Sequence, residues 1–261
     1  MTFDIVLPSI VSIVAITTVL LYAKFETKLK SLFEEKEFRV RDSIFLVVAM
    51  SFMVTVIVFV PQEAIKVLFL VAYFFVLFLF TYVAVEKWYL AVLPPIAFVA
   101  LYLFFWDLIL LNIFAILFAV FVSVYLGGLF SWTTVLIFAG LITVMDVVQV
   151  FVTGYMGEAA TKLIGLRLPV LVYVTTFPRD GWIGLGLGDI FLAGLLSIQT
   201  MLRFDRKTGV ISALSMGIAF FIYETIVFHF EFFGFFPATI VVLCGWLLGL
   251  GIHRLVGERG S

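Results

Sequence analysis

Long hydrophobic runs, separated by short polar segments, dominate the chain from residue 4 to residue 254. A helix that crosses a bilayer needs about 20 apolar residues, because the hydrocarbon core is about 30 Å thick. The pattern predicts nine membrane-spanning helices, at 4–22, 43–60, 66–85, 88–106, 108–126, 131–152, 183–202, 210–230 and 235–254. We therefore expect an all-α, multi-pass integral membrane protein.

Two polar segments between these runs differ from ordinary loops. Residues 23–42 carry a dense mixture of acidic and basic side chains, which predicts a solvated or interfacial amphipathic linker. The loop at 153–182 contains a β-branched run from Leu168 to Thr176, which is typical of a strand. The chain is thus predicted to be helical except for one extended segment.

The composition agrees with a lipid environment and narrows the chemistry. Hydrophobic residues make up 64% of the chain, against roughly 45–50% in soluble domains. The formal net charge of −1 gives no indication of a nucleic-acid partner. The single cysteine, Cys244, excludes an internal disulfide, and His229 and His253 are too few and too far apart to indicate a metal site. We predict neither a metal nor a cofactor.

The basic residues predict the orientation, because cytoplasmic loops of membrane proteins are enriched in lysine and arginine. With nine spans, twelve of the 16 basic residues fall on one side. The N-terminus is therefore predicted outside and the C-terminus in the cytoplasm. The basic residues of the predicted cytoplasmic side are Lys24, Lys28, Lys30, Lys36, Arg39, Arg41, Lys87, Arg203, Arg206, Lys207, Arg254 and Arg259. Those of the other side are Lys66, Lys162, Arg167 and Arg179.

Three acidic residues, Asp146, Asp189 and Glu224, lie within predicted spans. An ionisable group in hydrocarbon costs at least about 2.5–3.5 kcal/mol, so each demands a reason. Asp146 lies six residues before the end of its span, and Asp189 six residues after the start of the next. Because consecutive spans run in opposite directions, both carboxyls are predicted roughly 9 Å below the same surface. They either meet as a working pair or hydrogen-bond separately to neighbouring helices.

The residues around the aspartates favour a pair. Gly184 and Gly188 have the spacing of a small-residue helix face, which allows close packing or leaves room for an extended substrate and a water. Glu224 is predicted at a similar depth. It is either a third member of the site, a proton relay or, as we favour, a residue that faces a helix partner.

Three motifs around these residues resemble one family. The segment from Met145 to Met156 resembles the YD helix of signal peptide peptidases, and Leu185–Ile190 resembles their GxGD motif. The segment Phe236–Thr239 falls where that family carries its PAL motif. The match covers about residues 132–254. The chain thus resembles the presenilin and signal peptide peptidase class of GxGD intramembrane aspartyl proteases, in a microbial, archaeal-type form.

The resemblance implies a division of the chain and a set of site residues. Residues 1–130 would form a scaffold, and residues 131–261 would hold the catalytic helices and the strand-bearing loop. Asp146 and Asp189 would be catalytic, acting without a cofactor on transmembrane helices of other proteins, either type II anchors or remnant signal peptides. The implied substrate-binding residues are Gly186, Leu187, Gly188, Pro237, Ala238, Thr239 and, on the strand, Val172 and Val174.

Two positions depart from the family pattern. Met145 stands where a tyrosine usually precedes the first aspartate, and Thr239 replaces the leucine of PAL. Neither change removes a reacting group. We therefore expect them to affect substrate preference and local packing more than the chemistry.

Two other functions fit parts of the pattern. Prepilin-type peptidases also carry GxGD, but they favour a lysine two residues after the aspartate, where this chain has Phe191, and nine spans are too many for them. A cation-coupled transporter or channel would use the three buried acids for ion coupling, although no inverted repeat is visible. The sequence favours an intramembrane aspartyl endopeptidase, with the transporter or channel as the alternative.

Overall fold

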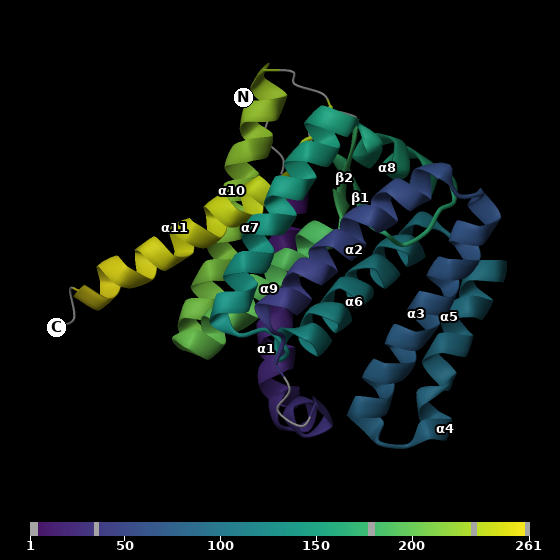
Figure 1. Ribbon diagram of the computed structural model, residues 1–261, viewed down its shortest axis with the longest axis horizontal. Coiled ribbons are helices and arrows are strands. Elements are labelled where there is room, and N and C mark those ends of the chain that lie inside the picture. The colour runs from purple at the N-terminus through teal and green to yellow at the C-terminus, as the bar shows by residue number, and fades with distance from the viewer. Residues whose placement is uncertain (1–4, 34–36, 177–180, 231–233, 259–261) are drawn as a thin grey trace.

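The computed structural model describes residues 5–33, 37–176, 181–230 and 234–258, and over these residues the chain is helical except for one β-hairpin (Figure 1). Its elements, in chain order, are α1 (Val6–Phe33), α2 (Val40–Phe59), α3 (Gln62–Val85), α4 (Trp88–Ala91), α5 (Leu93–Phe104), α6 (Leu108–Gly127), α7 (Trp132–Val148), the π-helical turn η1 (Gln149–Thr153), α8 (Tyr155–Gly165), β1 (Leu171–Thr176), β2 (Gly181–Gly186), α9 (Leu187–Arg203), α10 (Arg206–Phe230) and α11 (Ala238–Glu258).

Seven of the described helices are long and apolar enough to cross a membrane, which indicates a helical, multi-pass integral membrane protein. They are α1, α2, α3, α6, α7 together with η1, α10 and α11. The predicted span at 88–106 corresponds to the shorter apolar piece Trp88–Phe104, and the span at 183–202 to the 17-residue helix α9. The predicted number of nine spans is therefore not reached by long helices alone.

Two predicted boundaries are wrong. Residues 183–186 belong to strand β2, so the helix begins at Leu187, because this glycine-rich segment pairs with β1. Helix α1 continues past the predicted end of the first span to Phe33, so residues 23–33 of the predicted amphipathic linker are helical. Within this extension, Lys30 Nζ lies 2.7 Å from Glu26 Oε1 one turn earlier.

The main hydrophobic core joins the N-terminal helix to the C-terminal ones. Helix α1 packs against α6, α9 and α10, and α10 packs along α11. Glycines make these crossings close: a Cβ on Gly217 would lie 1.8 Å from Ser12 Oγ, and one on Gly245 would lie 2.5 Å from the Cα of Met216. Any side chain at either position would force the helices apart, which fits small-residue packing between membrane helices.

The β-hairpin is held by polar side chains that project from α3, α5 and α6. The hydroxyl of Tyr73 on α3 donates to the carbonyl of Pro169. Tyr102 on α5 donates to Leu166 O at 3.2 Å. The amide of Asn112 on α6 makes two bonds with the backbone of Tyr173, at 2.6 and 2.7 Å. In a largely apolar environment such bonds fix the path of the chain before and within β1.

Lys162 on α8 closes the end of α2. Its ammonium donates to the carbonyls of Ile57, Val58 and Val60, at 3.0, 3.1 and 2.5 Å. The last carbonyls of a helix have no partner within the helix, and the helix dipole makes this end partly negative. The Lys162 ammonium bonds these carbonyls, balances the negative end of the dipole and so anchors α8 to α2.

We expect Lys162→Met to lower the free energy of unfolding by about 1–3 kcal/mol, because three carbonyls lose a charged donor. Thermal unfolding of the purified protein in detergent measures the change. Lys66→Met is the matched control, since the Lys66 ammonium lies 5.5 Å from the centre of the Tyr102 ring and caps no helix in the contacts described. Equal melting temperatures for the two variants would contradict the capping role.

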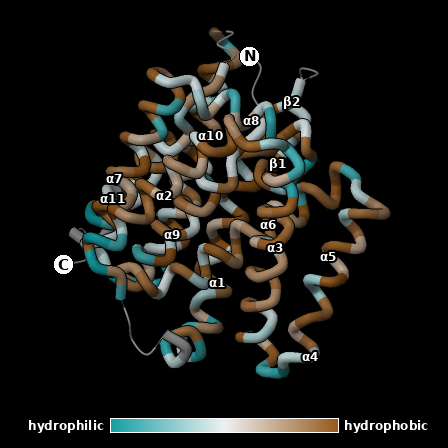
Figure 2. The backbone as a smooth tube through the Cα atoms, turned by 45° about the vertical axis from the view of Figure 1, so that its right-hand side comes forward, coloured by the Kyte–Doolittle hydropathy of each residue, from teal (hydrophilic) through white to brown (hydrophobic). Residues whose placement is uncertain are grey.

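Basic and polar residues lie at one end of several helices. Lys28 Nζ near the end of α1 lies 2.6 Å from Glu86 Oε1, which follows α3. This hydrogen bond and the Lys28 charge lower the pKa of the Glu86 carboxyl. At the start of α10, Thr208 Oγ1 lies 2.9 Å from Nδ1 of His253, near the end of α11. Figure 2 shows hydrophilic stretches at the lower ends of α1 and α4, with hydrophobic residues along the helices above them.

Candidate functional site

The candidate site lies where α7, α9 and α11 meet. At the opposite end of α7 these helices are joined by tryptophans: the rings of Trp132 and Trp246 lie 5.8 Å apart, and Trp246 Nε1 donates to Thr200 Oγ1 at 2.8 Å. Phe138 on α7 packs edge-on against Phe191 on α9, with ring centres 6.2 Å apart. These contacts fix the three helices below the site.

Asp146 lies near the end of α7 and is buried, with 8% of its surface exposed. Beyond it the helix widens into η1, a single π-helical turn of a kind that often occurs at functional sites. Gln149 in this turn donates to Ser51 O and Oγ on α2, at 3.0 and 2.8 Å. The turn ends at Gly154, whose φ of 71° is in the left-handed region that glycine adopts without strain.

Asp189 is the third residue of α9 and is half-buried. The helix starts directly from the hairpin, because the N–H of Leu187 donates to Val170 O at 3.0 Å and so extends the β ladder by one pair. Gly186, the residue before α9, leaves room for the carboxyl: a Cβ there would lie 3.0 Å from Asp189 Oδ2. The hairpin therefore determines where Asp189 lies.

Thr239 in the first turn of α11 joins the site to that helix. Its hydroxyl donates to Asp146 Oδ2 at 2.7 Å, across 93 residues of sequence. Thr239 is itself buried, and Pro237 lies just before the helix, where its missing N–H costs nothing. The carboxyls of Asp146 and Asp189 are close enough for their charges to interact. The carboxyls of Asp146 and Asp189 and the hydroxyl of Thr239 thus lie at the same end of the three helices.

Two other predicted features differ in the structure. Gly184 lies in β2 and a Cβ on Gly188 would meet nothing within 4 Å, so the predicted close helix face through these glycines is wrong. Glu224 lies on α10 with 1% of its surface exposed. It takes no part in the Asp146–Thr239 bond or in the interaction between the aspartates.

The side chains of Val172 and Val174 point into the core, with 0% and 9% of their surfaces exposed. Their backbone groups face β2, as the hydrogen bonds of neighbouring residues show. Tyr173 bonds to Asn112, away from β2, while Val170 bonds to Leu187 on the β2 side. Because antiparallel residues alternate between the two directions, Val172 and Val174 pair with Leu185 and Ile183.

The same alternation defines the outer edge of β2. Tyr173 is opposite Gly184, so the N–H and C=O of Gly184 point away from β1. The backbone N–H and C=O groups of Trp182 and Gly186 also point away from β1, and Trp182 and Gly184 are exposed. The outer edge of β1, in contrast, lies against α6 at Asn112. The outer edge of β2 leads directly to Asp189.

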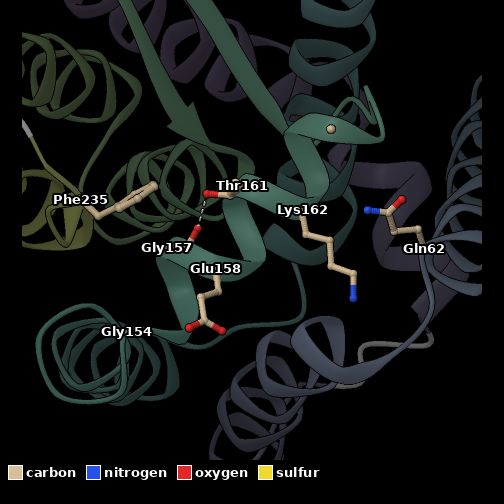
Figure 3. A pocket seen from close by; sticks show the side chains of 8 residues that line it. Gln62, Gly154, Gly157, Glu158, Thr161, Lys162 and Phe235 are labelled. Atoms are coloured by element: carbon tan, nitrogen blue, oxygen red, sulfur yellow. Dashed lines mark hydrogen bonds between the residues drawn. The ribbon is translucent and has the colours of Figure 1, made fainter.

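A recess of about 650 Å³ lies beside α8, between the segments that follow Asp146 and precede Thr239. Gly154, at the end of η1, and Phe235, just before Pro237, line one part of it. Figure 3 shows Phe235 and Gln62 on opposite sides of α8, from which Glu158, Thr161 and Lys162 project. The recess is open and partly polar, so water can enter it.

Three residues shape this site through contacts that the sequence did not predict. Asn112, a lone amide within an apolar run, occupies the outer edge of β1. Gln149 ties the π-helical turn to α2. Thr239 was predicted to affect packing, but its hydroxyl bonds directly to Asp146. The signal for Asn112 and Gln149 was a polar side chain inside a span, which usually has a buried partner.

Comparison with models of known protein families and with curated proteins finds no match for this chain.

Proposed function

We propose that this chain is an intramembrane aspartyl endopeptidase that hydrolyses peptide bonds within transmembrane helices, of the presenilin and signal peptide peptidase class that its motifs resemble. The observation that supports this most is the approach of Asp146 and Asp189, from α7 and α9, close enough for their charges to interact. We infer that the two carboxyls share one proton, because two negative charges that interact in a low dielectric are costly. A shared proton is the basis of aspartic protease chemistry.

The reaction follows from that shared proton. The ionised carboxylate removes a proton from a water molecule, whose oxygen attacks the carbonyl carbon of the peptide bond. The protonated carboxyl donates its proton to the carbonyl oxygen, which gives a tetrahedral diol. Transfer of a proton to the amide nitrogen then allows the C–N bond to break, and a carboxylic acid and an amine leave. The two aspartates titrate as one unit.

The outer edge of β2 is the part of the chain that fits an unwound substrate. A transmembrane helix protects its carbonyls by internal hydrogen bonds, so it must open locally before attack. The outward N–H and C=O groups of Gly184 offer such a segment new partners. Gly184 and Gly186 leave one face of the strand without side chains just before Asp189. We therefore propose a docking edge on β2, in place of the role predicted for Val172 and Val174.

The recess beside α8 supports the supply of water. Hydrolysis consumes one water per peptide bond, and a site among apolar helices needs a hydrated path. The segments lining the recess continue into the residues that carry Asp146 and Thr239. Lipid would surround the rest of the helices.

We propose nine membrane crossings, made by the seven long helices together with α5 and α9, and a cytoplasmic C-terminus. Lys28–Glu86 joins the ends of α1 and α3, and Thr208–His253 joins the start of α10 to the end of α11. These helix ends carry basic residues of the predicted cytoplasmic side, which supports the proposed orientation. Lys36, Arg179 and Arg259 lie outside the described residues. A reporter active only in the cytoplasm is expected to be active when fused after Ser261 and inactive when fused before Met1. The reverse pattern would contradict this orientation.

The function is tested by incubating the purified protein with a labelled transmembrane peptide in detergent or vesicles. We expect internal cleavage of the peptide, which a transition-state inhibitor of aspartyl proteases blocks. Ion flux into vesicles without cleavage would instead support a cation-coupled transporter or channel. Cleavage that persists at full rate with the inhibitor would exclude the aspartyl mechanism.

A further inference from the structure

We propose that Thr239 is a positioning residue for Asp146. Its hydroxyl orients the Asp146 carboxyl by a hydrogen bond that the leucine of the PAL motif cannot make. This inference rests on the proposed protease function. It concerns the hydrogen bond from Thr239 Oγ1 to Asp146 Oδ2 at 2.7 Å, which acts beside a backbone hydrogen bond of Thr239 to the same carboxyl.

The bond depends on the place of Thr239 in its helix. Threonines inside membrane helices usually donate to the carbonyl four residues earlier, as Thr225 does to Phe221 O at 2.7 Å. Thr239 is the second residue of α11, so the chain four residues earlier is not helical. Its hydroxyl is therefore directed across to another helix, and it bonds to Asp146 on α7.

Burial makes the bond strong and directional. Thr239 and Asp146 expose only 5% and 8% of their surfaces. A hydrogen bond to a carboxylate is roughly twice as strong as one between neutral groups, and the burial of both partners limits competition from solvent. The hydroxyl therefore holds the Asp146 carboxyl in one orientation.

The orientation has a chemical consequence. With Oδ2 bound to Thr239, the other oxygen of Asp146 is the one that exchanges a proton with water or with Asp189. A rotating carboxylate would spend part of its time with neither oxygen suitably directed. Thr239 thus contributes to the rate of the chemical step, while substrate binding on β2 does not depend on it.

The first two variants remove either the hydroxyl or the methyl group of Thr239. Thr239→Val keeps the shape of threonine without the hydroxyl, and Thr239→Ser keeps the hydroxyl without the methyl group. We expect Thr239→Val to lower kcat for a transmembrane peptide about 10- to 100-fold, with KM changed by less than about threefold. Thr239→Ser is expected to stay within about threefold of the unchanged protein in kcat. Thermal unfolding in detergent checks that each variant is folded.

A second pair keeps the inference testable if the valine variant does not fold. Thr239→Ala and Thr239→Ser both lack the methyl group, so a difference in kcat between them reports the hydroxyl alone. Thr225→Val is the matched control, because it removes a hydroxyl that bonds only within α10 in the contacts described, and its activity is expected to be unchanged.

The outcomes separate this inference from the proposed function. If the unchanged protein cleaves and Thr239→Val cleaves equally well, only the inference is wrong. If serine is as slow as valine or alanine, the methyl group and its packing matter, and the positioning role is also wrong. If the unchanged protein cleaves no transmembrane peptide, the proposed function is contradicted and the inference with it.

Discussion

Asp146→Asn and Asp189→Asn are each expected to lower peptide cleavage by at least about a thousandfold. An amide has nearly the size of the carboxyl but neither takes a proton from water nor shares one with the remaining aspartate. The two residues act as one unit, so the double variant is expected to be no slower than either single variant. Cleavage of a labelled transmembrane peptide, followed over hours, measures these rates.

Folding and catalysis respond differently to these changes. The oxygen of an asparagine at 146 still accepts the hydroxyl proton of Thr239, and removing a buried charge relieves a cost of solvation. We therefore expect melting temperatures equal to or above that of the unchanged protein. Asp107→Asn is the matched control, since Asp107 caps α6 through Leu110 N at 2.7 Å and asparagine caps equally well. A variant Asp189→Asn that cleaves at the normal rate would contradict the mechanism.

The hydrophobic pattern predicted the long helices because lipid imposes a simple condition on them: about 20 apolar residues in sequence. The same condition fails for short elements. The segment Gly181–Gly186 is apolar enough to be part of a span, and hydropathy does not distinguish it from a helix start. The segment forms a strand because it pairs with β1, and this contact with another segment is not visible in the local hydropathy.

The run at 168–176 was predicted as a strand, and β1 forms at Leu171–Thr176 within it. The residues before it are held by the side chains of Tyr73, Tyr102 and Trp106, at sequence separations of 61 to 96 residues. No local pattern reveals such partners. For the same reason, the sequence predicted the strand but not which of its edges would be covered.

The buried acids were predicted because an ionisable group in a span needs a structural or chemical reason. Their matched depth was argued from Asp189 lying six residues inside a helix. In the structure it lies in the first turn of α9, at the junction with the hairpin. Asp189 lies near the end of α7 in either position, but the hairpin, which the sequence did not predict as a whole, determines where it lies. The hydrogen bond from Thr239 to Asp146 joins residues 93 positions apart, so it could not be predicted without the fold.

Gly184→Pro is expected to reduce kcat/KM for a transmembrane peptide by about a hundredfold or more. The N–H of Gly184 points away from β1, so proline there removes a donor from the docking edge without removing a bond of the hairpin. The ring also blocks the approach of a substrate strand, which costs neighbouring hydrogen bonds of about 0.5–1.5 kcal/mol each. The same labelled peptide measures the effect.

Thr175→Pro is the matched control, because Thr175 has the corresponding outward direction on the opposite edge of the same hairpin. Its cleavage rate is expected to stay within about threefold of the unchanged protein. Leu185→Pro is a second comparison: it removes a hairpin bond to Val172 and is expected to destabilise the fold as well. If Gly184→Pro and Thr175→Pro reduce cleavage equally, the effect comes from general damage to the hairpin.

A change in the substrate tests the same edge without altering the protein. Methylation of single backbone nitrogens in the peptide removes one N–H at a time. If the peptide adds to β2 as a strand, methylation at alternate residues is expected to slow cleavage, because only every second residue directs its N–H toward β2. In Gly184→Pro this alternation is expected to be weakened, since the edge is already blocked. An equal effect at every methylated position would mean that the peptide binds in another conformation, even if the aspartates still cleave it.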